Sequence, residues 1–146
     1  DSLLYIGRGL DYALSMEGSL KLKEVSYIHS ESYAAGELKH GTISLIDEDV
    51  PVIAVATQTG IIPKTISNVV EVKSRGAKVI LVCTDACARE LKDGVADYVI
   101  EIPHTDELLM PITAVVPLQI LAYYTSINRG IDPDKPKNLA KSVTVE

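Results

Sequence analysis

The chain of 146 residues contains no tryptophan and no phenylalanine. Its seven tyrosines are its only aromatic residues, so any core must be built mainly from aliphatic side chains. With 47% hydrophobic and 23% charged residues, the composition is typical of a globular protein. A chain of this length makes one ordinary domain and can bury a core without disulfide bonds to hold it.

An excess of positive charge is also missing, since the formal net charge is -6. Proteins that wrap nucleic acid usually carry a basic patch, so nucleic acid is excluded as an expected partner. No apolar run reaches the usual length of a membrane span, and no signal peptide pattern is present. We therefore expect small-molecule or protein partners and a cytoplasmic location. The chain begins with aspartate rather than methionine, which indicates a piece of a longer protein.

Cysteine is scarce, and its two copies, Cys83 and Cys87, have neither the redox nor the zinc spacing. Cys83 ends an apolar run and is predicted to be a small buried side chain. Reduced thiols are typical of the cytosol. The three histidines, His29, His40 and His104, do not form a metal-binding spacing with one another or with the cysteines. We predict no metal ion and no organic cofactor.

Apolar runs alternate with helical patterns along the chain. The predicted strands are Leu3–Ile6, Pro51–Ala56, Lys78–Thr84 and a fourth within Val95–Ile102. The predicted helices are Tyr12–Ile28, Pro63–Arg75 and Met110–Asn128, with a kink or a helix start near Pro117. Continuous apolar strands separated by helices favour a parallel sheet covered on both faces. We predict a three-layer, doubly wound α/β domain over residues 1–131, followed by a C-terminal tail, 132–146.

Ligands of such sheets bind beyond the carboxyl ends of the strands, which draws attention to two loops. Gly7–Gly9 follows the first strand, but the third glycine of a dinucleotide fingerprint is replaced by Tyr12, so a tight turn is the better interpretation. Thr57–Gly60 offers hydroxyls and backbone amides that could hold a phosphate. A plain turn explains the same residues and is favoured here.

The first predicted helix carries charges in an unusual place. On a helical wheel its apolar residues gather on one arc, and Asp11 and three serines take the other. Glu17, Lys21 and Glu24 fall inside the apolar arc. An ordinary i,i+4 ion pair on a solvated face is one explanation. The other is a functional cluster, because burying ions costs several kcal/mol on an order-of-magnitude scale and a carboxylate beside a lysine can move a proton to or from carbon.

Two further residues are candidates by context. His40 lies in a short polar stretch bounded by glycines, where a histidine is either structural or functional. Lys141 lies five residues from the end, where a solvated lysine is the ordinary expectation. The apolar residues around it would allow the tail to dock, and burial could then free its amine for nucleophilic chemistry.

Several motifs together resemble the glutamine–fructose-6-phosphate aminotransferase family. The resemblance covers essentially the whole chain and rests on Glu17–Glu24 (EGSLKLKE), Tyr27–His29, Gly36–Gly41 (GELKHG), Pro117–Tyr123 and Asn138–Glu146 (NLAKSVTVE). Members of that family carry two sugar isomerase (SIS) domains behind a glutaminase domain, and this chain is similar to the second SIS domain. The resemblance implies fructose 6-phosphate as substrate, glucosamine 6-phosphate as product, and a homodimer.

The resemblance also implies roles for single residues. Glu24 is expected to move the proton between C1 and C2 of the sugar, with help from Lys21. Lys141 is expected to form a Schiff base with the open-chain ketose, and His40 to assist ring opening in the neighbouring subunit. Glu17 and, from the tail, Ala140 are expected to contribute to the substrate site.

One departure limits this expectation, because the main phosphate loop of the family lies in the first SIS domain. The 146 residues alone should therefore bind fructose 6-phosphate poorly and turn over little. Two other functions stay open: a non-catalytic SIS module that senses a sugar phosphate, and a deaminase or deglycase of amino-sugar phosphates. An upstream glutaminase domain would distinguish the aminotransferase from the last of these.

Overall fold

A single five-stranded sheet forms the centre of the molecule, and every neighbouring pair of strands is parallel. The computed structural model describes residues 2–137 and 139. The strands follow the spatial order β2-β1-β3-β4-β5. In chain order they are β1 (Ser2–Gly7), β2 (His29–Ala34), β3 (Val52–Ala56), β4 (Val79–Thr84) and β5 (Tyr98–Ile102). The winding reverses between β1 and β3, so the loops after these strands meet at the switch point of the sheet.

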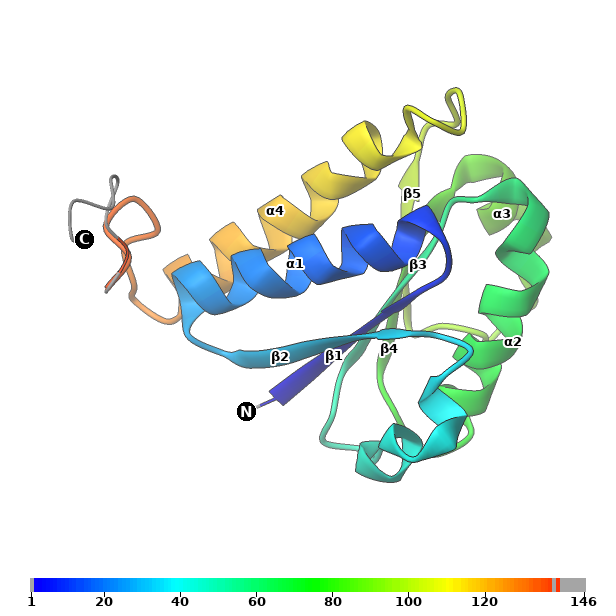
Figure 1. Ribbon diagram of the computed structural model, residues 1–146, viewed down its shortest axis with the longest axis horizontal. Coiled ribbons are helices and arrows are strands. Elements are labelled where there is room, and N and C mark those ends of the chain that lie inside the picture. Colours follow the sequence, from blue (N-terminus) through cyan, green and yellow to red (C-terminus); the bar gives the residue numbers. More distant parts are fainter. Residues whose placement is uncertain (1, 138, 140–146) are drawn as a thin grey trace, which may run out of the picture.

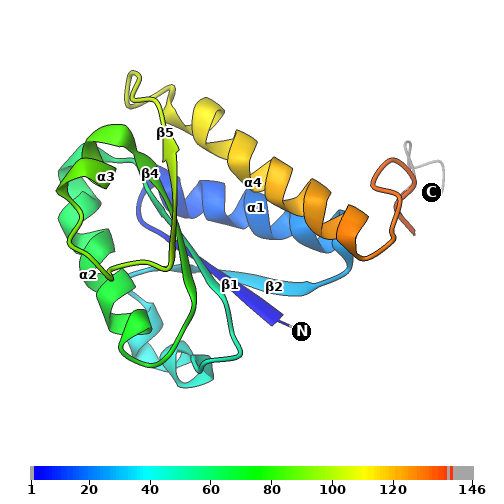
Figure 2. The same ribbon diagram turned by 180° about the vertical axis from the view of Figure 1, so that it is seen from behind.

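Helices cover both faces of this sheet, as Figures 1 and 2 show from opposite sides. The long helices α1 (Leu10–Ser26) and α4 (Met110–Asn128) lie side by side on one face. On the other face lie α2 (Ile62–Lys73) and the short α3 (Asp85–Glu90). Three 3-10 turns complete the described elements: η1 (Leu38–His40), η2 (Thr42–Leu45) and η3 (Thr59–Ile61). The predicted doubly wound, three-layer α/β fold is confirmed.

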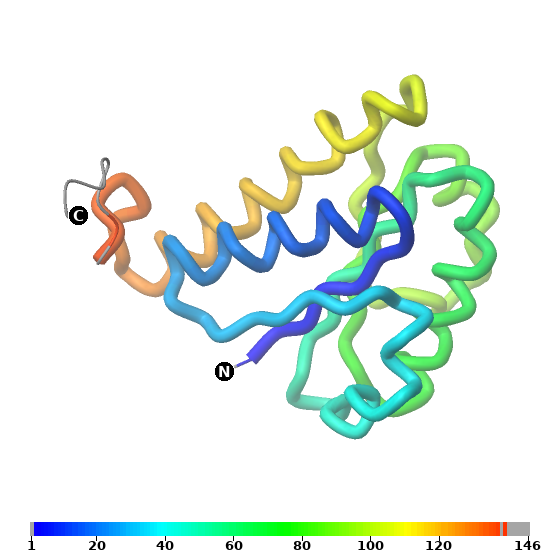
Figure 3. Tube along the Cα trace, viewed as in Figure 1, coloured from blue at the N-terminus to red at the C-terminus, as the bar shows by residue number. Residues whose placement is uncertain are grey.

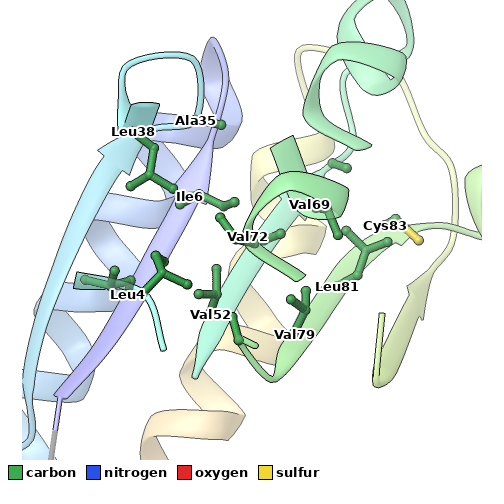
Figure 4. Close-up of a cluster of buried hydrophobic side chains, with 14 of the residues drawn as sticks. Leu4, Ile6, Ala35, Leu38, Val52, Val69, Val72, Val79, Leu81 and Cys83 are labelled. Atoms are coloured by element: carbon green, nitrogen blue, oxygen red, sulfur yellow. The ribbon is translucent and has the colours of Figure 1, made fainter. Parts of the chain in front are cut away.

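The strands divide the core into two clusters because successive side chains of a strand point to opposite faces. All five residues of β3 are buried. Val52 and Ala54 join the cluster beneath α2, where Val69 and Val72 pack against the sheet (Figure 4). The alternate residues of β3 face α1 and α4 instead, beside Tyr5 and Leu118. A central strand buried on both faces reads as a continuous apolar run, which is why it was predictable.

The predicted elements are all present, and α1 begins and ends two residues earlier than expected. Strand β2 and helix α3 were not predicted. The sequence of β2, HSESYA, lacks an apolar run because this edge strand pairs only with β1. Helix α4 continues through Pro117, so no helix starts there.

By length and composition alone α4 is apolar enough to cross a membrane, so the expectation that no apolar run reaches that length is wrong. In the structure, one side of α4 packs against α1 and the sheet through Ala114, Leu118 and Ala122. Its outer side exposes several large apolar side chains, among them Ile112, Ile120, Tyr123 and Tyr124.

Candidate active site

Helix α1 does not bury the face that its sequence predicts. The apolar arc was expected to face the core, but Met16 is 46% and Leu20 is 43% exposed. The polar arc is buried instead, since Asp11, Ser15, Ser19 and Ser26 are each at most 2% exposed. Of the predicted apolar arc, Leu14 does reach the core. The expectation that Glu17, Lys21 and Glu24 share the buried side is therefore wrong.

Small residues explain this inversion. A Cβ atom on Gly18 would lie 2.9 Å from Leu118 Cδ1 of α4 and 3.0 Å from Tyr5 Cε1 of β1, so glycine lets three elements approach closely. The serine hydroxyls beside it are satisfied locally. Ser15 donates to the carbonyl of Asp11, and Ser26 donates to that of Leu22. A buried hydroxyl that is hydrogen-bonded carries little desolvation penalty, so a serine face packs as an apolar one would.

The three charged residues of α1 form one cluster on its outer side. Lys21 Nζ lies 2.6 Å from Glu24 Oε2 and 3.6 Å from Glu17 Oε1. Their side chains are between 25% and 43% exposed, so solvent still reaches all three. The hydrogen bond to Glu24 is the main cause that raises the pKa of Lys21, against the opposing effect of burial. Lys21 is therefore a cation at neutral pH, and it positions the carboxylate of Glu24.

The segment that follows α4 lies against the end of α1 that carries this cluster. Ser126 Oγ, in the last turn of α4, lies within hydrogen-bonding distance of the carbonyl of Val25 and of the carbonyl of Ile131, the second residue after Arg129 at the end of the helix. The backbone N–H of Lys137 donates to Tyr27 Oη at 2.5 Å, and Lys137 Nζ stands 5.7 Å from the centre of the Tyr27 ring. Figure 3 shows this segment, in orange, beside the end of the blue helix. Lys141 and Ala140 lie outside the described residues.

Tyr27 is the only described non-glycine residue with a positive φ, at 59°. Its backbone ends α1 and turns the chain into β2. A side chain in this conformation is strained by about 1 kcal/mol or more, and such strain is often found at functional sites. Here its hydroxyl and ring both contact Lys137, so the turn also positions the start of the tail.

His40 is not brought to this cluster. It lies in η1, beyond the carboxyl end of β2, whereas Glu24 lies near the end of α1 where β2 begins. The six residues of β2 separate the two positions by about 20 Å. The histidine side chain is 63% exposed, with Nε2 4.0 Å from Glu37 Oε2. Within one chain, His40 and Glu24 therefore cannot act on the same sugar.

The two loops at the switch point are held together by a buried carboxylate. Asp11 Oδ2 accepts hydrogen bonds from the backbone N–H groups of Thr57 and Gln58, at 2.8 and 3.3 Å. Asp11 Oδ1 accepts from the Thr57 hydroxyl at 2.5 Å. Burial is the main cause that raises the pKa of Asp11, while these hydrogen bonds lower it. The groups that might have held a phosphate already bind a side chain, which supports the interpretation of Thr57–Gly60 as a turn.

Sequence reasoning missed Asp11, which the wheel placed on the solvent side, and a second contact nearby. Arg8 donates two hydrogen bonds to Asn68 Oδ1 of α2, at 3.1 and 2.9 Å. Its guanidinium also packs against Gly36, where a Cβ atom would lie 2.8 Å from Arg8 Nη2. The Gly7–Gly9 turn thus connects β1 to α2 and to the segment after β2. Only the glycines at positions 7 and 36 signalled this close approach in the sequence.

The remaining candidates are structural where they are described. Cys83 is fully buried, as predicted. His29 Nε2 lies 3.5 Å from Glu31 Oε1 on the edge strand. Among residues 2–137 and 139, no group of three or more histidine, cysteine, aspartate or glutamate side chains could hold a metal ion.

Comparisons with known proteins identify similar chains. The family model described as SIS domain matches residues 1–129. A curated relative from Clostridium perfringens, glutamine–fructose-6-phosphate aminotransferase [isomerizing], is 57% identical over 144 residues, which are 99% of this chain and 24% of the relative. The chain thus spans about a quarter of the length of this relative.

Solved structures agree with this result. The C-terminal domain of glucosamine-fructose-6-phosphate aminotransferase from Francisella tularensis superposes with a TM-score of 0.87 at 40% identity, covering 92% of this chain and 37% of that one. A glucosamine-6-phosphate deaminase from Thermotoga maritima gives a TM-score of 0.75 at 29% identity, covering 98% of this chain and 40% of that one.

Proposed function

Since the chain belongs to the SIS domain family, we propose that it is the second SIS domain of a cytoplasmic glutamine–fructose-6-phosphate aminotransferase. The observation that carries this proposal is the cluster on α1, in which Lys21 fixes the Glu24 carboxylate at 2.6 Å beside the docked start of the tail. Its substrate is fructose 6-phosphate and its product is glucosamine 6-phosphate.

The chemistry assigns one task to each group. The amine of Lys141 condenses with the C2 carbonyl of the open-chain ketose and releases water. Ammonia then displaces the lysine, which leaves an imine at C2. Glu24 removes a proton from C1, and the resulting enolamine takes a proton at C2, giving an aldehyde at C1 and an amine at C2. Lys21 stabilises the charge that develops on the way, and Glu17 holds Lys21 in place.

Chain length supports the role of Lys141. It follows Lys137 by four residues, which span at most about 14 Å when extended. Glu24 precedes Tyr27, the residue that contacts Lys137, by one turn of α1, a rise of about 4.5 Å. The amine of Lys141 is therefore within reach of the cluster, and the preceding residue, Ala140, is assigned to the substrate site.

Two partners complete the site in this proposal. His40, which is too far from Glu24 in the same chain, assists ring opening in a second copy, so the enzyme acts as a homodimer. The first SIS domain of the same polypeptide covers the outer side of α1 and α4, where Met16 and Leu20 are exposed beside the charged cluster. That domain supplies the phosphate site, and the glutaminase domain supplies ammonia.

Reductive trapping on the full-length enzyme tests this proposal. Fructose 6-phosphate is added without glutamine, the mixture is reduced with borohydride, and the modified peptide is mapped by mass spectrometry. We expect a hexitol phosphate adduct on Lys141 that is absent from Lys141→Ala. The matched control Lys135→Ala removes another lysine of the same tail and should leave the adduct unchanged.

Glu24→Gln separates imine formation from proton transfer in the same experiment. The adduct on Lys141 should persist, while synthesis of glucosamine 6-phosphate falls about 100- to 10,000-fold, the usual contribution of a positioned acid or base. An adduct on another lysine, or none, would remove Lys141 from the mechanism and favour a sugar-phosphate sensor.

A deaminase is the second candidate, because the Thermotoga maritima structure covers 98% of this chain. The two functions differ in the direction of nitrogen transfer. If the full-length protein releases ammonia from glucosamine 6-phosphate but does not use glutamine to form it, the deaminase assignment replaces the aminotransferase.

A further inference from the structure

The segment Gly36–Gly41, called here the His40 loop, is fixed to the rest of the chain at two points. The first is Leu38, which is 1% exposed and joins the core cluster beneath α2. Within the loop the backbone N–H of His40 donates to the carbonyl of Glu37 at 3.0 Å. The His40 side chain itself is 63% exposed. The loop thus presents an exposed histidine on an anchored backbone.

The second point is Arg8, in the turn after β1. A Cβ atom on Gly36 would lie 2.8 Å from Arg8 Nη2, 3.0 Å from Nη1 and 3.1 Å from Cζ, so the guanidinium group lies directly against the start of the loop. The same group donates from Nε and Nη2 to Asn68 Oδ1 of α2, at 3.1 and 2.9 Å. Arg8 therefore holds the His40 loop against α2.

Arginine is the residue suited to this junction. Its donors lie in one rigid plane, so two hydrogen bonds to a single oxygen fix the orientation of the whole group. A glycine at position 36 lets that plane approach the backbone, since any larger residue would collide with it. The backbone adds one further contact, from the N–H of Ala35 to the carbonyl of Gly7 at 2.8 Å.

We propose that Arg8 is a positioning residue for His40 and so serves the active site of the neighbouring subunit, not that of its own chain. This inference rests on the proposed function, in which His40 assists ring opening in a second copy. Arg8 acts through the loop at Gly36, four residues before the histidine. Because Glu24 and His40 of one chain lie about 20 Å apart, each site takes them from different chains, and an effect of Arg8 can be assigned to one chain.

Mixed dimers of the full-length enzyme test this inference. Two differently tagged chains are co-expressed, dimers that carry both tags are isolated, and synthesis of glucosamine 6-phosphate is measured. The reference pair is Glu24→Gln with His40→Ala. One of its two sites has both residues intact, so about half of the wild-type activity is expected.

Arg8→Met is then paired with each of these variants. With Glu24→Gln it should also give about half of the wild-type activity, because the remaining Glu24 meets a correctly held His40 from the other chain. With His40→Ala the activity should be about 10- to 100-fold lower, since the only histidine left is misplaced and a displacement of about 1 Å can cost 100-fold.

The reverse pattern, with activity beside His40→Ala but not beside Glu24→Gln, would show that Arg8 serves its own chain and would overturn the inference. So would equal activity of the two Arg8→Met pairs. An inactive reference pair would instead refute the shared site of the proposed function, on which the inference depends.

Two further variants guard against a misfolded Arg8→Met chain. Asn68→Ala keeps the arginine but removes its acceptor, and it should give the same pattern in mixed dimers. Asn68→Asp keeps an acceptor oxygen and should restore the activity. Arg75→Met is the matched control, because Arg75 is an exposed arginine just after α2 and its loss should leave synthesis unchanged.

An acyclic substrate separates positioning of His40 from general support of the fold. 5-Deoxyfructose 6-phosphate lacks the hydroxyl group that closes the furanose ring, so it needs no ring opening. Arg8→Met homodimers should be about 10- to 100-fold slower than wild type with fructose 6-phosphate, yet equal to wild type with the 5-deoxy analogue. Equal losses with both substrates would show that Arg8 only stabilises the fold.

Discussion

Helices α1 and α2 follow neighbouring strands of one sheet, yet they bury opposite kinds of surface. Helix α2 packs Val69 and Val72 on the sheet. Helix α1 packs Gly18 and a row of serines beside Leu14 and Leu22. It turns Met16 and Leu20 outward. Helix α2 therefore buries its apolar face, as an amphipathic helix usually does, whereas α1 buries most of its small polar residues and exposes Met16 and Leu20.

The difference has a physical consequence. A helix whose only neighbour is its own sheet needs one apolar face, and α2 has one. Helix α1 has an inner face on which small residues lie between the buried side chains of Leu14 and Leu22, and an outer face on which apolar side chains flank Lys21 and its two carboxylates. An exposed apolar surface beside charged residues is typical of an interaction or ligand site. The exposed face of α1 is therefore the surface on which we place the proposed site.

The largest effect on stability is expected at the inner face of α1. Gly18→Val forces a branched side chain against Leu118 and Tyr5, where even a Cβ atom would lie within 3.0 Å. Overpacking of this kind lowers the free energy of unfolding by about 1–3 kcal/mol. Urea denaturation of the chain measures it.

Met16→Ser is the matched control on the outer face of the same helix. Because Met16 is 46% exposed, its loss should change the free energy of unfolding by no more than about 0.5 kcal/mol. If this control destabilises the chain as much as Gly18→Val does, the inverted packing of α1 is wrong.

A smaller effect is expected from the serines themselves. Ser30 Oγ donates to the carbonyl of Ser19, so the Ser19 hydroxyl is the donor in the 2.9 Å contact between the two side chains. Ser19→Ala removes that hydrogen bond and should lower the free energy of unfolding by about 1 kcal/mol. Ser67→Ala, at an exposed position of α2, should change it by less than about 0.5 kcal/mol. Equal values from the two denaturation curves would mean that the buried hydroxyl contributes nothing.

The same contrast explains what sequence alone could predict. Strands β3 and β4 and helix α2 were found because burial on a sheet leaves apolar patterns with a regular period. The wheel failed on α1 because it assumes that apolar residues define the buried side. A wheel carries no information on the close packing that Gly18 allows, or on the hydrogen bonds that buried serines donate to backbone carbonyls.

The candidate site shows a similar limit. The proximity of Glu17, Lys21 and Glu24 follows from helical spacing and was predicted, although their placement on the core side was not correct. Contacts between distant segments could not be predicted from periodicity. The hydrogen bond between Lys137 and Tyr27 joins residues 110 positions apart, and that of Asp11 with Thr57 joins residues 46 apart.

The smallest expected effect is on the pH dependence of stability, which should differ between the ion pair of α2 and the ion pair of α1. Asp97 pairs with Lys73 of α2 and accepts from the Val79 N–H at 2.7 Å, contacts that lower its pKa. A carboxyl group whose pKa is lowered in the folded state stabilises the fold at pH values above its unfolded pKa of about 4. This stabilisation is lost as the pH falls through the pKa of the folded state. The advantage of wild type over Asp97→Asn, below about 1 kcal/mol because the pair is partly exposed, should vanish in acid.

The raised pKa of Lys21 gives the opposite pH dependence, with stability lost in alkali. The advantage of wild type over Lys21→Met should be present at neutral pH and be lost as the pH rises through the folded pKa of Lys21, which lies above the unfolded value of about 10.4. Thermal unfolding midpoints of the three proteins across pH measure both effects. An advantage over Asp97→Asn that persists in acid, or an advantage over Lys21→Met that persists in strong alkali, would contradict the corresponding ion pair.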